Sequence, residues 1–294
     1  MLTDAVSRIP VGVRYMLMSA LGFALMSACV KLVNTHGIPV LEIVAARAFI
    51  SLLISYADIK RKNISMWGNN KVLLVARGGV GSIALIFVYY SVSTLPLAEA
   101  TIFQYLHPVF TALLAVIFLK EKVHRSTIIC IVLCLLGLTI MVNPSMDLAS
   151  ELPMLSVAAA LTGAFLSAIA YVIVKRLSRS EDSSVIILYF PLMALPMSVI
   201  LLGEDYVVPD LNALILLVFV GIFTQVGQVG LTKAMQTEVA SKATAYSYVQ
   251  VVFSIILGWL IFSEVPAFWT WIGGALIIIG ALINLFGNKR KRIQ

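Results

Sequence analysis

Ten apolar stretches of about 20 residues divide almost the whole chain. An α-helix rises 1.5 Å per residue, so roughly 20 apolar residues cross the roughly 30 Å hydrocarbon core of a bilayer. Each stretch is bounded by charged or turn-forming residues, and together they cover 13–33, 38–57, 72–94, 97–119, 126–143, 153–175, 184–203, 211–234, 239–262 and 267–287. The pattern predicts an all-α integral membrane protein with ten transmembrane helices, whose backbone polar groups pair within each helix.

The composition agrees with a membrane protein and leaves little room for catalysis. Hydrophobic residues make up 61% of the chain, charged residues 12%, and the mean hydropathy is +1.01. The sequence holds no metalloprotease histidine pair, serine-nucleophile elbow or phosphate-binding loop. Cys130 and Cys134 share a helix face, but no third ligand lies near them in the sequence. We therefore expect no enzymatic activity, no cofactor and no metal.

Charged residues alternate between successive loops. Lys and Arg gather near the N-terminus, in every second loop and in the tail 289–292. The intervening loops lack Lys and Arg, and they hold the acidic residues Asp147, Glu151, Glu204, Asp205, Asp210 and Glu264. Because basic loops stay on the cytoplasmic side, this pattern predicts a multi-pass protein of the inner membrane with both termini cytoplasmic. It also accounts for the net charge of +7 through membrane lipids, without a nucleic-acid partner.

The chain contains an internal repeat with an offset of 143 residues. The segment ATIFQYLHPVF at 100–110 resembles ATAYSYVQVVF at 243–253. The positions that agree at this offset include Ala100 and Ala243, Thr101 and Thr244, Tyr105 and Tyr248, Phe110 and Phe253, Glu121 and Glu264, and Gly137 and Gly280. Each half, 1–145 and 146–294, then holds five spans, and an odd number makes the second copy enter the membrane from the opposite side. Inverted repeats around a central cavity are typical of secondary transporters that work by alternating access.

Polar residues recur on one face of the fourth span. Thr101, Gln104, Pro108 and Thr111 are spaced 3, 4 and 3 residues apart, which places them on one helix face. Their repeat partners in the ninth span are Thr244, Ser247, Val251 and Ser254. We expect these two stripes to line the cavity, although Ser and Thr also mediate close packing between membrane helices.

Pro108 is a candidate helix hinge, because proline removes a backbone hydrogen bond. The ninth span has Val251 at this repeat position, so we expect only the fourth span to be interrupted.

Arg47 is the most costly residue in the predicted bilayer. It lies near the middle of the second span, where a charge costs roughly 2.5–3.5 kcal/mol on insertion scales. Glu42 projects about 140° away on an ideal helix and is a poor partner. Arg47 is predicted either to bind a substrate carboxylate or phosphate, or to pair with another helix.

Two further ionisable residues are candidates for proton coupling. His107 is one of them, because a free imidazole titrates near physiological pH, and the alternative role for it is that of a packing residue held by hydrogen bonds. Glu99, near one end of the fourth span, has Lys242 as its repeat partner. Both of these side chains could instead extend to the membrane interface.

The eighth span carries a second polar stripe of Gln225, Gln228 and Thr232, which faces either the cavity or another helix. Tyrosines supply either flat walls for an aromatic solute or interface anchors. The predicted substrate-binding residues are Arg47, Tyr89, Gln104, His107, Thr111, Gln225, Gln228, Ser247 and Tyr248.

The chain resembles the EamA family of the drug/metabolite transporter superfamily over nearly its whole length. The residues that carry this resemblance are Ala100, Pro108, Glu121 and Gly137 in the first half, and Ala243, Val251, Glu264, Gly273 and Gly280 in the second. The resemblance implies a ten-helix carrier for small organic metabolites, often an exporter of amino acids or related compounds.

The leading hypothesis is therefore a secondary transporter of a small amino acid-like or other polar or amphipathic solute, working by efflux or exchange. One alternative is uptake of a cofactor-like or nucleoside-like solute, and another is a non-transporting scaffold or lipid-handling protein. The partners expected are the small-molecule substrate and membrane lipids. The oligomeric state is left open, and a monomer is plausible because one chain carries both repeats.

Overall fold

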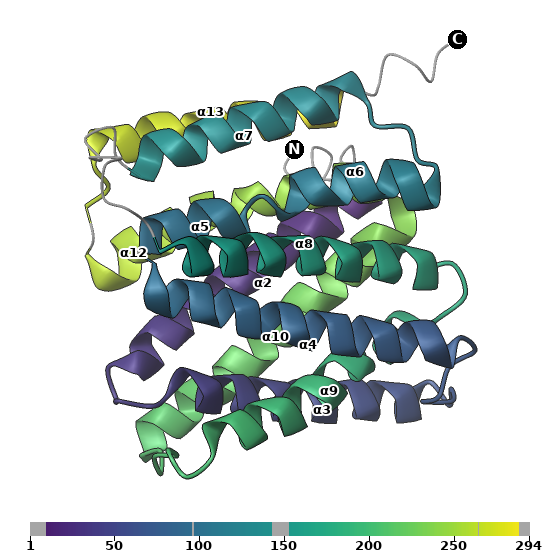
Figure 1. Ribbon diagram of the computed structural model, residues 1–294, viewed down its shortest axis with the longest axis vertical. Helices are drawn as coiled ribbons and strands as arrows, with labels where there is room; N and C mark the ends of the chain where they lie inside the picture. The colour runs from purple at the N-terminus through teal and green to yellow at the C-terminus, as the bar shows by residue number, and fades with distance from the viewer. Residues whose placement is uncertain (1–9, 96, 143–152, 264, 288–294) are drawn as a thin grey trace, which may run out of the picture. The chain divides into compact units, whose positions relative to one another are not determined.

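The computed structural model describes residues 10–95, 97–142, 153–263 and 265–287, and within them every regular element is a helix (Figure 1). Glu264, the acidic loop residues Asp147 and Glu151, and the basic tail lie outside the described residues. The side chain of Glu99 also lies outside them, so its candidate role stays a prediction.

The helices follow the predicted spans closely. Their bounds are α2 Val11–Asn34, α3 Val40–Arg61, α4 Lys71–Thr94, α5 Leu97–Gln104, α6 His107–Leu119, α7 Arg125–Val142, α8 Met154–Leu177, α9 Ser183–Leu202, α10 Leu211–Thr237, α11 Ala240–Ala245, the 3₁₀ turn η1 Tyr246–Tyr248, α12 Val249–Phe262 and α13 Phe268–Phe286. In the described part of the chain nine helical segments are long and apolar enough to cross a membrane, and a shorter tenth covers Arg125–Met141. The predicted all-α architecture of ten membrane helices is confirmed.

The fourth and ninth spans are both interrupted, at equivalent repeat positions. In the fourth span, α5 ends at Gln104 and α6 begins at His107. In the ninth span, η1 separates α11 from α12. The expectation that only the fourth span is interrupted is therefore wrong. In the ninth span the Ser247 hydroxyl donates back to the Thr244 carbonyl at 2.7 Å, and such side-chain bonds distort a helix without a proline.

The ends of these two spans also match at the repeat offset. Lys120 closes α6 with φ 54°, and Ser263 closes α12 with φ 55°, both in the left-handed region. Left-handed residues at this place satisfy the last carbonyls of a helix. The same terminating conformation thus recurs 143 residues later on a different residue type.

The chain divides into two compact units, and each takes helices from both halves of the sequence. Unit 1 consists of residues 1–82 and 173–237, and unit 2 of residues 83–172 and 238–294. The sequence halves 1–145 and 146–294 remain a prediction about repeats, because the compact units cut across them.

In unit 1, α10 packs along α2, and α3 packs along α9, as Figure 1 shows for the latter pair. Glycine allows the first contact, since a Cβ on Gly22 would lie 2.8 Å from the backbone nitrogen of Gly227.

In unit 2, α7 packs along α13 (Figure 1), and α6 packs against α11. The buried residues between α7 and α13 include Cys130, Cys134, Leu138 and Ile277. Both cysteines are fully buried, and their sulfur atoms lie 3.9 Å apart.

Candidate functional site

The interruption of the fourth span rearranges its backbone hydrogen bonds. Because Pro108 has no N–H, the carbonyl of Gln104 loses the donor that a continuous helix would supply. His107 Nδ1 lies 3.0 Å from this carbonyl oxygen. The imidazole thus takes the place of the missing backbone donor.

The next carbonyl is satisfied by the ninth span. Val109 N donates to the Leu106 carbonyl at 3.0 Å, so the Tyr105 carbonyl has no partner from its own helix. The Tyr248 hydroxyl donates to this oxygen at 2.8 Å, and Tyr248 is fully buried. A side chain of one interrupted span therefore completes the backbone hydrogen bonding of the other.

His107 also contacts the ninth span directly. Its Nε2 lies 3.4 Å from the Ser247 hydroxyl oxygen, and the side chain is 8% exposed. Thr111 is buried one turn further along α6, where its hydroxyl donates to the His107 carbonyl at 2.7 Å. Four residues of the predicted site, His107, Thr111, Ser247 and Tyr248, therefore lie together in unit 2.

Aromatic rings surround this junction. Tyr105 stacks on Tyr248 with ring centroids 5.6 Å apart, and the Tyr171 ring of α8 meets His107 edge-on at 5.3 Å. Tyr105 and Tyr171 were among the tyrosines expected to form either flat walls for a solute or interface anchors, and neither was predicted to bind substrate. Their position beside His107 comes from packing between helices, which residue spacing along one helix does not reveal.

Arg47 lies in unit 1, near the middle of α3, and is partly buried. Its NH1 atom lies 3.8 Å from the Met26 sulfur of α2. No carboxylate of the described residues lies within ion-pair distance of Arg47. Glu42 instead accepts a hydrogen bond from Val207 N at 2.9 Å. This agrees with the expectation that Glu42 and Arg47 lie on different faces of α3.

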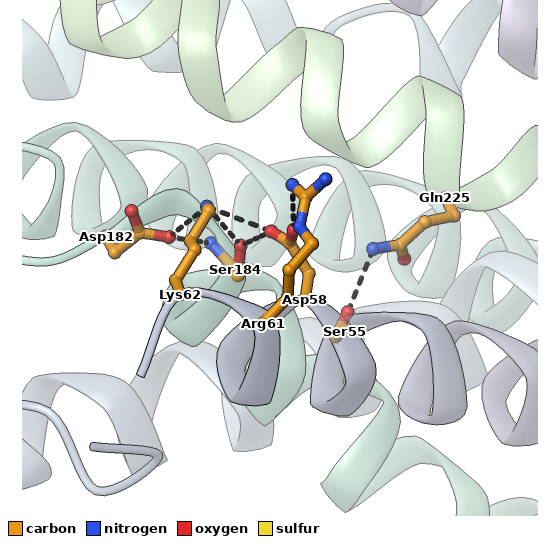
Figure 2. A network of polar contacts seen from close by, with 7 residues as sticks. All are labelled: Ser55, Asp58, Arg61, Lys62, Asp182, Ser184 and Gln225. Carbon is orange, nitrogen blue, oxygen red and sulfur yellow. Dashed lines mark hydrogen bonds and ion pairs between the residues drawn. The ribbon is translucent and has the colours of Figure 1, made fainter. Parts of the chain in front are cut away.

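Gln225 is held between two helices of unit 1. It is 7% exposed, its Nε2 donates to the Ser55 hydroxyl at 2.9 Å (Figure 2), and its Oε1 accepts from the Ser51 hydroxyl. These bonds occupy the amide, so the structure supports the packing alternative for this residue. Gln228, one turn further along α10, is only half-buried.

A polar cluster joins the C-terminal end of α3 to the N-terminal end of α9 (Figure 2). Lys62 Nζ lies 2.9 Å from both Asp58 and Asp182 and donates to the Ser184 hydroxyl at 2.8 Å. Ser184 donates in turn to Asp58, and Arg61 also pairs with Asp58. We name these five residues the α3–α9 cluster. In the sequence, Arg61 and Lys62 indicated only the orientation of the chain in the membrane. Asp182, which precedes Ser183, is nevertheless a recognisable N-cap signal for α9.

The ion pairs of the α3–α9 cluster favour the charged forms. Partial burial works against the charge on Lys62, but hydrogen bonds to Asp182 and Asp58 outweigh it and raise the pKa of the ammonium group. Partial burial likewise works against the Asp182 carboxylate, and the bonds from Lys62 and Ser184 outweigh it and lower the pKa of that carboxyl. These ion pairs and hydrogen bonds hold the end of α3 against the start of α9.

The remaining predicted residues have fewer contacts. Gln104 is exposed at the end of α5, and Tyr89 is half-buried on α4. The predicted site thus divides between the two units. Unit 1 holds Arg47, Gln225 and Gln228, and unit 2 holds Tyr89, Gln104, His107, Thr111, Ser247 and Tyr248.

Ten apolar helices, an internal repeat and two interrupted spans at equivalent positions define a class of protein, the secondary transporters with duplicated halves. Comparison with known proteins gives the family. The model of the EamA-like transporter family matches residues 10–143 and 154–286. The chain belongs to this family, and it is a multi-pass membrane protein that transports small metabolites.

Several relatives have named functions. The pseudopaline exporter CntI of Pseudomonas aeruginosa is 31% identical over 280 residues, covering 95% of this chain and 97% of the relative. Human solute carrier family 35 member G1 is 31% identical over 299 residues, covering 96% of this chain and 80% of the relative. A riboflavin transporter of Vibrio cholerae is 23% identical, covering 96% of this chain and 95% of the relative. A solved crystal structure with 19% identity shows the same fold, with a TM-score of 0.81 over 93% of this chain and 98% of that one.

Proposed function

We propose that this protein exports a small anionic or zwitterionic metabolite, of an amino acid-like class, and that Arg47 binds the carboxylate of the solute. The observation that carries the proposal is the state of Arg47. It lies in the middle of α3, partly buried, and among the described residues no carboxylate pairs with it. A charge retained at this depth is costly, and a carboxylate ligand would offset part of that cost.

The direction of transport and the orientation of the protein in the membrane belong to the same proposal. The exporter CntI aligns with 95% of this chain, which supports efflux. The alternation of basic and acidic loops supports insertion in the inner membrane with both termini in the cytoplasm. Tyr89, Gln104 and Gln228 stay candidate substrate contacts, because none of them is fully buried.

An aromatic, cofactor-like solute is the second candidate. It is supported by the rings of Tyr105, Tyr171 and Tyr248 around His107, since stacked aromatic side chains suit planar solutes. The 23% identity to a riboflavin transporter agrees with this candidate. Uptake, rather than efflux, would then be the direction to test.

The first prediction concerns Arg47 and the class of the solute. We expect carboxylate-bearing solutes, within a panel of amino acids, dicarboxylates, amines, nucleosides and flavins, to raise the melting temperature of the purified protein. Arg47→Gln should weaken this binding about 10- to 100-fold, as expected for loss of a charged hydrogen bond worth about 1.5–3 kcal/mol. Arg47→Lys should retain part of the affinity, because it keeps the charge and loses the bidentate geometry.

The control is Arg176→Gln, at an exposed arginine near the end of α8, which should leave binding unchanged. If carboxylates stabilise wild type and Arg47→Gln equally, Arg47 is a structural residue. Stabilisation by flavins or nucleosides alone would instead support the second candidate.

A further inference from the structure

We propose that His107 is the proton-binding site of this carrier, that the Ser247 hydroxyl oxygen accepts a hydrogen bond from the protonated Nε2, and that proton uptake loosens the junction between the two interrupted spans. The proposal rests on the transport function proposed above and adds the coupling ion to it. The ligand is a proton from water, and the group that binds it is the Nε2 lone pair of His107.

The hydrogen bond of Nδ1 decides where the first proton of the imidazole lies. Nδ1 is 3.0 Å from the Gln104 carbonyl, which can only accept. The Nδ1 atom must therefore carry a hydrogen in either charge state. In the neutral ring this leaves Nε2 with its lone pair, and Nε2 is the atom that faces Ser247.

Ser247 is placed to accept from a protonated Nε2. Its hydroxyl has one hydrogen, which it donates to the Thr244 carbonyl at 2.7 Å, so its oxygen lone pairs face His107 at 3.4 Å. When Nε2 gains a proton, the bonds run in one direction, from Nε2 to Ser247 and from Ser247 to Thr244. In the neutral ring Nε2 has no hydrogen, so it donates no hydrogen bond to Ser247 across the 3.4 Å contact. Both ring nitrogens thus face acceptors, but both acceptors are uncharged oxygens, and the junction supplies an imidazolium with no countercharge among the described residues.

The other groups around the imidazole are phenols. Tyr171 of α8 faces the ring at 5.3 Å, Tyr105 lies at 6.1 Å, and Tyr248 stacks on Tyr105. The face of an aromatic ring attracts a cation and its edge does not, so these rings do not replace a countercharge. On α11, Lys242 is paired with Glu238 at 2.9 Å. No carboxylate of the described residues lies within ion-pair distance of His107, so its proton is not held permanently by a countercharge.

Burial links the proton to a change of conformation. His107 is 8% exposed, and burial disfavours the charged ring, so the neutral ring belongs to the conformation described here. A proton on Nε2 then favours any conformation that admits water to the junction. The junction is built from interrupted helices, in which the Gln104 carbonyl is satisfied by His107 of the same span and the Tyr105 carbonyl by Tyr248 of the other span. Proton binding and opening of this junction are therefore coupled equilibria.

The second prediction tests proton binding without any solute. The chain has three histidines, so nitrogen NMR of the ¹⁵N-histidine-labelled protein gives three imidazoles, assigned with His36→Gln and His124→Gln. At pH 8 we expect His107 to carry its proton on Nδ1 with a bare Nε2, and on acidification towards pH 4 to gain a second proton on Nε2. Ser247→Ala should lower the proton affinity of His107 about tenfold, since it removes a hydrogen bond to a charged group.

The matched control is Ser254→Ala, on the same polar stripe of the ninth span, which should leave the titration unchanged. A His107 that is still fully neutral at pH 4, an Nε2-protonated tautomer at pH 8, or equal titrations in the two serine variants would each overturn the proposal.

Hydrogen exchange of residues 243–254 tests the coupling to conformation. After correction for the intrinsic effect of pH, we expect protection to fall between pH 8 and pH 5 in wild type, by up to about tenfold per pH unit for one linked proton. His107→Gln should remove this response, and an unchanged response in that variant would refute the coupling. Neither experiment depends on Arg47 or a solute, so the proposed carboxylate binding can fail while proton binding stands.

Discussion

Individual polar residues in the membrane helices of this protein have different roles, and the contacts of each residue distinguish these roles. Between α10 and α3, the amide oxygen of Gln225 accepts from the Ser51 hydroxyl, and its amide nitrogen donates to the Ser55 hydroxyl. His107 uses one nitrogen to replace a missing backbone donor and places the other beside the Ser247 hydroxyl. Arg47 has only a sulfur contact within the described part of the chain. Two residues that are equally conspicuous in the sequence, Gln225 and Arg47, are therefore predicted to respond to mutation in opposite ways.

The third prediction is that Gln225→Leu destabilises the fold and spares transport. The leucine would leave the buried hydroxyls of Ser51 and Ser55 without their partner, at a cost of about 1–2 kcal/mol. Reversible unfolding in mixed detergent micelles measures this loss. Gln228→Leu, on the half-buried neighbour one turn away, is the control and should change stability less. Loss of transport with unchanged stability in Gln225→Leu would instead make Gln225 a substrate contact.

At the scale of elements, glycines decide which helices can approach closely. α7 and α13 touch through their backbones, since a Cβ on Gly137 would lie 2.6 Å from the Gly273 carbonyl oxygen. A Cβ on Gly273 would overlap Met141 and the Gly137 carbonyl. Membrane helices gain much of their association energy from such close packing, because lipid supplies no hydrophobic drive.

The fourth prediction compares two adjacent glycines of α13. Gly273→Ala should destabilise the protein by about 1–3 kcal/mol, because the added methyl has no room beside α7. Gly274→Ala should be neutral or stabilising by about 0.5–1 kcal/mol, since only Ile255 Cδ1 lies near, at 3.9 Å, and alanine favours the helix. Thermal unfolding of both variants measures the difference. Equal losses at the two positions would show that α7 and α13 do not meet through Gly273.

At the scale of the whole molecule, the repeat and the compact units divide the chain differently. The repeat relates the fourth span to the ninth and the fifth to the tenth, and all four of these spans lie in unit 2. Unit 1 likewise draws on both halves, with α2 and α3 from the first and α9 and α10 from the second. Each compact unit therefore combines helices from both halves of the sequence.

The fifth prediction tests the proposed orientation. In a background with Cys29→Ala, a membrane-impermeant maleimide applied to intact cells should label Tyr206→Cys, in the exposed loop between α9 and α10. Arg176→Cys, exposed at the end of α8, should be labelled only after permeabilisation. The parent without either cysteine controls for Cys130 and Cys134, which are fully buried. The reverse labelling pattern would invert the topology.

Sequence alone determined the ten spans, the repeat and the family, because these depend on local properties. Hydropathy along the chain decides which segments enter the bilayer, and an offset of 143 residues aligns two copies without knowledge of contacts. The spacing of Arg47 and Glu42 on one helix also excluded their pairing, and the structure gives Glu42 a different partner. These inferences need only the period of a helix and the thickness of a membrane.

Tertiary structure decided what each polar residue touches. The placement of Gln225 against Ser51 and Ser55 depends on which face of α10 meets α3. The 3₁₀ turn in the ninth span, where no proline occurs, accompanies the hydrogen bond from Ser247 to the Thr244 carbonyl and the packing of Tyr248 on Tyr105. Tyr171 reaches His107 from another helix. The physical reason is that every membrane helix has the same apolar exterior, so hydropathy places a helix in the bilayer, and only side-chain packing and hydrogen bonds choose its neighbours.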